Sequence, residues 1–403
     1  MRNAVRIGRL FGIELRVDTS WLLIFALVIW SLTSLFGSWH PDWAISTRIL
    51  VAVSAALAFF ASVVFHEMAH SLVARLYGIP VRDITLHMFG GVSNIEREPP
   101  TAGSEFFMAV VGPLASIGLG VMLMVGGAFL AGIGAPDVET PADLAQRMGP
   151  ITTVVMWLGP VNVIVGVFNL IPGFPLDGGR ILRSILWKAT GSLESATRWS
   201  TTAGQLVGWA FIVMGAFMAF GYTVPFFGRG LGGGIWLALI GFFLRNAALQ
   251  HQAGAALTQE LAGVRVADLM RKQGLWVAAD VSLDVVTQMF VQHEERAFPV
   301  FEGGQFVGLV SITDVRAARK GAGVATNAAA RDVMTPLERL TVTTPDTDLV
   351  DAIRSLGRGP FSELPVVDHG VLVGMLFDRD VARWLELRSA PRPTPRRRRE
   401  SHA

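Results

Sequence analysis

The sequence predicts an α-helical polytopic membrane domain with about six spans and small membrane-associated β elements, followed by a soluble α/β module. The first observation is composition, since 51% of the 403 residues are hydrophobic and only 16% are charged. Soluble proteins carry about 25% charged residues. The second is a series of long apolar segments within the first 250 residues. The third is an internal repeat beyond Leu249, where the composition becomes that of a soluble domain.

Six apolar segments are candidates for membrane spans, which need about 17 to 25 residues. They run over residues 21–36, 49–76, 106–133, 151–176, 203–222 and 231–244. The first is marginal in length and the last is short. We therefore expect a membrane domain over residues 1–250.

Basic residues predict the orientation, because cytoplasmic loops carry an excess of them. They precede the first segment, separate the second from the third and follow the fourth: Arg2, Arg6, Arg9, Arg16, Arg75, Arg82, Arg97, Arg180, Arg183, Lys188 and Arg198. The alternate loops hold only Arg48, Arg147 and Arg229. We expect a multi-pass cell-membrane protein with both termini and the C-terminal module in the cytoplasm. No small-residue cleavage site follows the first segment, so a removable signal peptide is not expected.

A cluster of ionisable residues, His66, Glu67 and His70, lies in the cytoplasmic half of the second segment. Residues i and i+4 share a helix face, so both imidazoles can bind one ion while Glu67 reaches a water molecule on it. A chance match or a packed histidine is the alternative. Ionisable groups within spans are costly and usually functional, and three occur together here, which favours a metal site.

Asp177 is the candidate third ligand, because it is the only acidic residue between Asp143 and Glu194. The chain has no cysteine, so a zinc site must use histidine and carboxylate, the ligands of open catalytic sites. Pro172 and Pro175 end the preceding helix and predict a re-entrant turn that carries Asp177 to the histidines. The alternative is an ordinary turn at the membrane exit, with Asp177 solvated.

The paired motifs, His66-Glu67-Met68-Ala69-His70 and Asn169 to Gly178 (NLIPGFPLDG), resemble those of site-2 proteases, the intramembrane zinc metalloproteases. The resemblance covers residues 1 to about 250 and includes RIGRLFGIELRVDTSW and ITLHMFGGVSNIE. It implies that His66, His70 and Asp177 hold one Zn²⁺, that Glu67 is the general base, and that Asn169 assists the substrate or the oxyanion. It also implies a transmembrane protein substrate, such as an anti-sigma factor or a membrane-held transcription regulator.

Two segments with alternating apolar residues, 13–17 and 84–88, predict a small sheet near the membrane. We hypothesise that a free edge along residues 84–88 binds an extended substrate by strand addition. A hairpin that only caps the domain is the alternative. We expect His87 to be a strand residue rather than a fourth ligand, and Gly90 and Gly91 to line a water route.

The repeat beyond Leu249 covers residues 251–388, with copies at about 261–320 and 328–387. FPVFEGGQFVGLVSITDV in the first copy matches LPVVDHGVLVGMLFDRDV in the second, and the pair resembles a tandem CBS (Bateman) module. The resemblance implies an adenine nucleotide near Ser311 and Asp314 and, in the second copy, near Asp380. Phe377 replaces the hydroxyl residue there, which places that cleft in doubt. A purely structural pair, or one that forms a homodimer, is the alternative.

Two function classes follow from these features. The first is an intramembrane endopeptidase, gated by a ligand of the repeat module. The second is a CBS-regulated transporter or channel that uses the histidine, glutamate and aspartate side chains as an ion path, but a path needs polar groups spread across the bilayer. Residues 389–403 should form a disordered basic tail. The one contact expected for this tail is with membrane lipids. No feature indicates nucleic-acid binding.

Overall fold

The computed structural model describes residues 4–88, 90–95, 97–131, 148–261, 263–272, 274–293, 295–320, 328–356 and 363–389. The chain divides into two compact units, Met1–Ala255 and Ala256–Ala403. The C-terminal residues of the predicted basic tail, 390–403, lie outside the described residues.

Six helices of the described part are long and apolar enough to cross a membrane, which confirms the six predicted spans. They are α1 (Trp21–Trp39), α2 (Ile45–Leu76), α3 (Ala102–Ala131), α5 (Pro150–Asn169), α7 (Leu193–Ala219) and α8 (Leu231–Leu261). Large apolar side chains on their surfaces are exposed, such as Trp30 (73%) and Phe129 (87%). Such surfaces suit lipid rather than water, so the chain is a multi-pass membrane protein.

Most helix boundaries differ from the predicted segments by a few residues, and three differences are larger. The fourth apolar segment was expected to reach residue 176, but α5 ends at Asn169 because the proline-rich turn that follows cannot continue it. The fifth helix begins at Leu193, ten residues before the predicted start, and the Ser192 side chain caps it. The sixth is longer than expected, since the apolar part of α8 runs over Leu231–Gly254.

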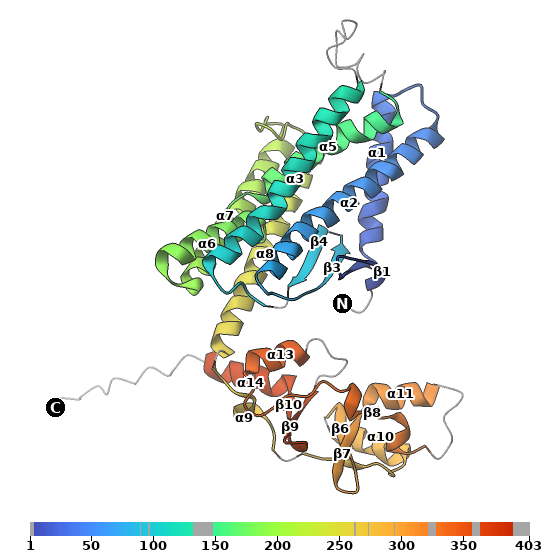
Figure 1. Cartoon of the computed structure of the whole chain (residues 1–403), viewed down its shortest axis with the longest axis vertical. Coiled ribbons are helices and arrows are strands. Elements are labelled where there is room, and N and C mark those ends of the chain that lie inside the picture. Colours follow the sequence, from blue (N-terminus) through green and yellow to red (C-terminus); the bar gives the residue numbers. More distant parts are fainter. Residues whose placement is uncertain are drawn as a thin grey trace, which may run out of the picture. The chain divides into compact units, whose positions relative to one another are not determined.

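Helix α3 lies between α2 and the shorter helix α6 (Asp177–Thr190) and packs against both (Figure 1). It also packs along α5, while α6 packs against α7. The first two spans share their own buried cluster, in which Phe36 of α1 is fully buried. The core of the unit is therefore built around α3, with α2 and α6 on its flanks.

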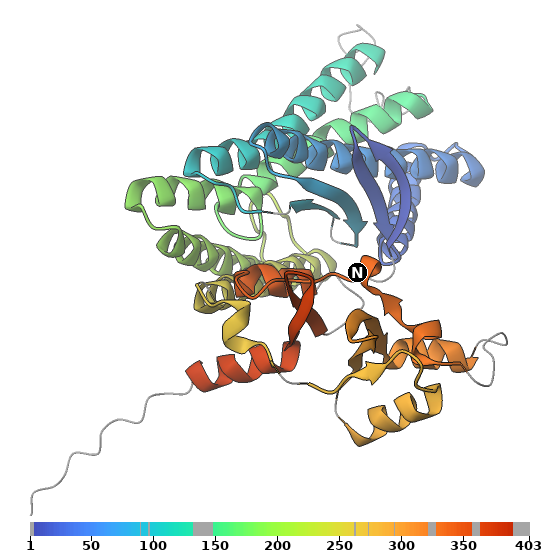
Figure 2. The same ribbon diagram turned by 60° about the horizontal axis from the view of Figure 1, so that its bottom comes forward.

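A four-stranded sheet, in the order β1-β2-β3-β4, packs on α2 (Figure 2). Its strands are β1 (Ala4–Leu10), β2 (Ile13–Asp18), β3 (Val81–His87) and β4 (Gly90–Ile95), with β2 and β3 parallel and the other pairs antiparallel. The expected free edge along residues 84–88 is wrong, because β3 is paired on both sides. The free edges are β1 and β4. His87 is the last residue of β3, so it is a strand residue, as predicted.

The second unit contains two similar sets of strands and helices. The first set comprises α9 (Val266–Leu269), β5 (Val277–Ala278), α10 (Leu283–Gln292), β6 (Ala297–Glu302), β7 (Gln305–Ser311) and α11 (Ile312–Lys320). The second comprises α12 (Ala330–Val333), β8 (Thr335–Pro336), the 3-10 turn η1 (Leu337–Arg339), α13 (Leu349–Leu356), β9 (Glu363–Asp368), β10 (Val371–Phe377) and α14 (Asp378–Ser389). Each set has one apolar cluster.

The first helical turn of each set packs in the apolar cluster of the other set. Val266 and Leu269 of α9 pack in the cluster of the second set, around Leu349. Ala330 of α12 packs in the cluster of the first set, and its amide donates to the carbonyl of Val281 (2.8 Å). Each core is therefore incomplete without the other copy, so the pair must fold as one body.

Candidate metal centre

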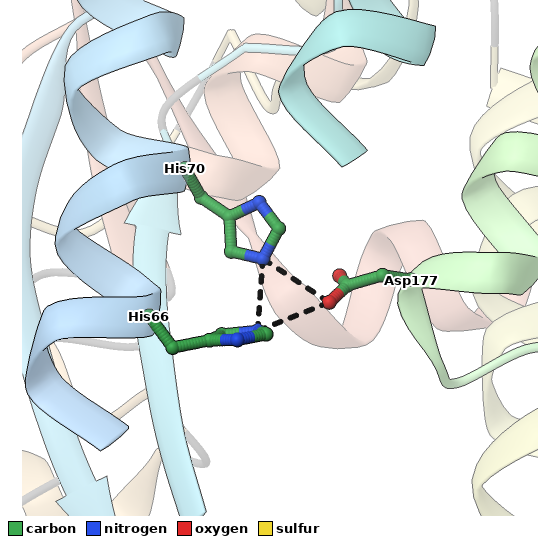
Figure 3. Close-up of side chains that lie close together, drawn as sticks. All are labelled: His66, His70 and Asp177. Carbon is green, nitrogen blue, oxygen red and sulfur yellow. Dashed lines mark hydrogen bonds and ion pairs between the residues drawn. The ribbon is translucent and has the colours of Figure 1, made fainter. Parts of the chain in front are cut away.

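The two histidines of α2 and the aspartate at the start of α6 point toward one another (Figure 3). The Nε2 atoms of His66 and His70 are 3.1 Å apart, and Asp177 Oδ2 lies 3.1 Å from each of them. Both histidines are 5% exposed, and the Asp177 side chain is 15% exposed. The structure thus brings together three donor atoms from segments more than 100 residues apart in sequence.

These three donors fit a divalent metal ion. In a tetrahedral zinc site with bonds of about 2.0–2.1 Å, neighbouring donor atoms lie about 3.3 Å apart. The observed separations of 3.1 Å are close to that value. In the part of the chain that the structure describes, this is the only group of three or more histidine or acidic side chains suited to a metal. Three protein ligands leave one tetrahedral position for water or substrate, as in catalytic sites.

Helix α3 orients both imidazoles through contacts with their Nδ1 atoms. His70 Nδ1 donates to the carbonyl oxygen of Met108 (2.5 Å), and His66 Nδ1 lies 2.9 Å from Ser116 Oγ. Since a backbone carbonyl only accepts, the hydrogen of His70 sits on Nδ1, and its Nε2 lone pair faces the cluster. Gly112 lies between these two contacts, and a Cβ atom there would be 2.1 Å from His70 Nε2. The histidine ring therefore occupies the space that a side chain at residue 112 would need.

Glu67 is held by the edge strand β4. Ser93 Oγ donates to Glu67 Oε2 (2.7 Å) and lies 3.2 Å from Ser71 Oγ. A Cβ atom at Gly91 would come within 2.6 Å of Glu67 Cγ, so the strand backbone passes directly beside this carboxylate. The two predicted water-route glycines lie in this strand, and Gly91 contacts the candidate base.

The turn before Asp177 is packed too closely for larger residues at several positions. A Cβ atom at Gly178 would be 2.3 Å from the carbonyl oxygen of Ile171, and one at Gly204 would be 2.0 Å from that of Phe174. Phe174 itself is 2% exposed. The turn is therefore closely packed at Gly173 and Phe174, and it leads directly into α6, whose first residue is Asp177.

Asn169 is the one residue of the predicted catalytic set for which the structure shows a different contact. Its side-chain amide donates to the carbonyl of Val165 within α5 (3.0 Å). Its assistance to a substrate stays a prediction.

Sequence reasoning missed four contributors to this site: Met108, Gly112 and Ser116 of α3, and Ser93 of β4. Gly112 and Ser116 are small residues four positions apart on an apolar helix, a pattern that marks a close helix contact. A backbone carbonyl such as that of Met108 gives no signal in a sequence.

The predicted nucleotide contacts in the second unit are engaged with protein groups. Ser311 Oγ donates to Asp314 Oδ2 (2.6 Å) at the start of α11. Asp380 accepts two hydrogen bonds from Arg271, Nε to Oδ2 (2.7 Å) and Nη2 to Oδ1 (2.6 Å), and this contact raises the pKa of Arg271 above its usual value. The Phe377 ring lies 5.0 Å from the guanidinium carbons of both Arg271 and Arg379.

A cavity of about 570 Å³ adjoins these groups, with Phe377 and Arg379 in its wall. The other lining residues are Arg296, Glu363, Asp378 and Ala382. Ligand pockets in proteins commonly have volumes of about 300–1,000 Å³. The size is therefore sufficient for a nucleotide, although Asp380 is held by Arg271.

Comparison with known proteins agrees with this division of the chain. Residues 54–215 match Peptidase family M50, and residues 266–321 and 330–387 each match the CBS domain. The chain is 31% identical to the putative zinc metalloprotease Rip3 of Mycobacterium tuberculosis, over 98% of this chain and 96% of the relative. It is 27% identical to the zinc metalloprotease MJ0392 of Methanocaldococcus jannaschii, over 96% of this chain and 97% of the relative.

Among solved structures, the site-2 protease from Methanocaldococcus jannaschii matches 62% of this chain and 95% of its own length, at 26% identity and a TM-score of 0.41. The identity to Rip3 extends over both the spanning helices with the histidine cluster and the repeat module. The chain therefore belongs to peptidase family M50, the site-2 proteases, and is a multi-pass membrane metalloprotease with a C-terminal pair of CBS domains.

Proposed function

We propose that this protein is a zinc-dependent intramembrane endopeptidase that hydrolyses a peptide bond in or near a transmembrane segment of another membrane protein. The observation that carries the proposal is the triangle of donor atoms formed by the two buried histidines of the spanning helix α2 and by Asp177 at the start of α6. The charged cluster occupies one depth of α2 rather than a path across the bilayer, so a transporter or channel is not favoured.

His66, His70 and Asp177 would hold the zinc ion, which when bound supplies an acidified water molecule and a Lewis acid. Glu67 follows the first histidine in α2 and would accept a proton as the water attacks the peptide carbonyl. The same carboxylate would return a proton to the leaving amine. Ser93 keeps one oxygen of Glu67 in a fixed place before substrate arrives. Asn169 donates one amide hydrogen to the carbonyl of Val165 and would assist the developing oxyanion with the other.

The free edge of β4 is the best place for an extended substrate. This strand pairs only with β3, and its residues Gly91 and Ser93 contact Glu67. A peptide that adds as a fifth strand would place its backbone beside the general base. The substrate would be a membrane-anchored protein, such as an anti-sigma factor or a transcription regulator held at the membrane, cleaved in regulated intramembrane proteolysis.

The CBS pair would gate this activity through an adenine nucleotide. Ser311 and Asp314 can turn toward a ribose by exchanging their mutual hydrogen bond for contacts with the ligand. In the second copy, Arg271 holds Asp380, so we assign the nucleotide to the first copy. The excess of basic residues in the predicted cytoplasmic loops supports a cytoplasmic position for both termini and this module. A homodimer through the CBS pair is a further part of the proposal.

The decisive test compares zinc content and cleavage in Glu67→Gln and Asp177→Ala, purified in detergent without chelators. Glu67→Gln should retain about one zinc per chain, as wild type does, and lose cleavage of single-span membrane proteins presented in the same micelles. Asp177→Ala should lose both. Normal cleavage by Glu67→Gln would exclude the general-base role, and a wild-type protein without zinc would exclude the metal site.

Gating is tested separately with AMP as the probe. We expect AMP to bind wild type and change its cleavage rate, and a Ser311→Ala/Asp314→Ala variant to lose both effects. If AMP binds without any change in rate, the pair is a nucleotide-binding module without gating.

A further inference from the structure

A buried ion pair joins α3 to α6 close to the metal cluster. Arg183 Nε donates to Glu105 Oε1 (2.6 Å), and Arg183 Nη2 contacts the same oxygen. The Glu105 side chain is 0% exposed and the Arg183 side chain 7%. Arg180 Nε is more distant, at 3.9 Å from that oxygen. Removing Arg183 would leave the Glu105 carboxylate almost without a partner, since its Oε2 has no hydrogen bond in the described part of the chain.

The two partners lie on the helices that determine the shape of the triangle. Glu105 is three residues before Met108, whose carbonyl holds His70. Arg183 is six residues after Asp177, about 9 Å along α6. Asp177 is the only one of the three donors that does not come from α2. Its distance from the histidines therefore depends on how α6 sits against α3.

Arg183 also contacts the turn that leads to Asp177. Its guanidinium carbon lies 5.3 Å from the centre of the Phe174 ring, and Phe174 is 2% exposed. The backbone of Phe174 also packs against Gly204 in α7. A single guanidinium thus touches both α3 and the segment just before the aspartate.

A directional contact is needed here because apolar packing is non-directional. Apolar contacts alone therefore do not select one position of α6 along α3. A charge-assisted hydrogen bond has a preferred distance and direction, and fixing register is the best-attested role of a buried polar pair.

We infer that the Arg183–Glu105 pair is a positioning device that sets Asp177 at metal-binding distance from His66 and His70. This inference rests on the proposed zinc site. Neither residue contacts the substrate or the reacting atoms, so both act through Asp177. The measurable consequence is a change in zinc affinity that exceeds any effect of the pair on the stability of the metal-free fold.

The test measures zinc affinity by chelator competition, together with the thermal unfolding midpoint of the metal-free protein. Arg183→Met should lower zinc affinity by about 10- to 100-fold, the usual effect of removing a supporting contact of a metal site. Arg183→Lys keeps the charge but loses the planar fork, so it should fall in between. Arg198→Met is the matched control, because Arg198 forms an exposed pair with Glu194.

Phe36→Leu controls for loss of stability alone, since Phe36 is buried in the α1–α2 cluster away from α3 and α6. If Arg183→Met and Phe36→Leu lower the unfolding midpoint equally and both bind zinc as wild type does, the pair is structural only and the inference is wrong. If Arg183→Met fails to fold, Arg183→Met/Glu105→Leu removes both charges and should fold. Wild-type zinc affinity in that double variant would also overturn the inference.

The outcomes separate this inference from the proposed function. Wild type without zinc, or Asp177→Ala with wild-type affinity, refutes the metal site itself. Zinc binding by wild type, its loss in Asp177→Ala and no change in Arg183→Met refute only the positioning role.

Discussion

Gly112→Ala should remove zinc from this protein although the substitution adds only one methyl group. The new Cβ atom would lie 2.1 Å from His70 Nε2, 2.5 Å from Cε1 and 2.8 Å from Cδ2. Non-bonded carbon and nitrogen atoms prefer about 3.5 Å, so the ring would have to move by more than about 1 Å. Metal sites tolerate errors of about 0.2 Å in ligand position. His70 would then no longer reach an ion held by His66 and Asp177.

Changes to residues that support a metal ligand typically lower metal affinity by about 10- to 100-fold. Gly112→Ala should lower zinc affinity by more than this, because it displaces a direct ligand. Helix propensity works in the opposite direction, since alanine favours a helix over glycine by about 1 kcal/mol. Loss of metal therefore cannot be attributed to a weaker helix. Chelator competition in detergent, with one zinc per chain as the wild-type reference, provides the assay.

Gly118→Ala is the matched control on the same helix, because no heavy atom lies within 4 Å of a Cβ atom there. It should bind zinc as wild type does. The reasoning is refuted if Gly112→Ala also retains wild-type zinc affinity, since the close contact between α3 and the His70 ring would then not exist.

Three further predictions concern the general base, the helix core and pH. Gly91→Ala should retain zinc but lower the cleavage rate at least about 10-fold, because its Cβ atom would be 2.6 Å from Glu67 Cγ; unchanged cleavage would contradict this contact. Phe36→Ala should reduce the free energy of unfolding by about 3–5 kcal/mol, and an unchanged unfolding midpoint would argue against the α1–α2 cluster. Burial lowers the pKa of His40, so the unfolded chain binds a proton more readily as pH falls below about 6.5. The unfolding midpoint of zinc-loaded protein should therefore fall between pH 7.5 and 5.5, and less so in His40→Gln.

The spanning helices were predictable from apolar length, but their ends were not. The first turns of α7 contain the polar residues Thr197 and Thr201, which precede the apolar segment that begins at residue 203. Both hydroxyls donate to carbonyl oxygens of their own helix, Thr197 to Leu193 (2.8 Å) and Thr201 to Thr197 (2.9 Å). Threonines whose hydroxyls are satisfied in this way can therefore lie within the helix, before its apolar part begins.

The order of the strands was beyond the reach of pattern analysis. Alternating residues identify β2 and β3 as strands. The two strands pair in parallel, and the spanning helices α1 and α2 lie between them in the sequence, so no turn signal indicates that they are neighbours. For this reason the free edge was assigned to β3 rather than to β4. The hydroxyl of Ser93, which holds Glu67, belongs to the strand that pattern analysis did not favour.

The histidine pair and Asp177 could be predicted as site residues from the sequence, because ionisable groups in a membrane domain are costly and are usually functional. The residues whose contacts hold these side chains in place give no comparable signal in the sequence. Glu105, Met108, Gly112 and Ser116 recur at spacings of three, four and four residues, so they lie along one face of α3. Along that single face are the partner of Arg183, the carbonyl that fixes the His70 tautomer, the space for its ring and the hydroxyl beside His66. Helix α3 contributes no metal ligand, yet one stripe of its surface contacts both ligand-bearing helices, so substitutions on that face should affect metal binding while those on its lipid face should not.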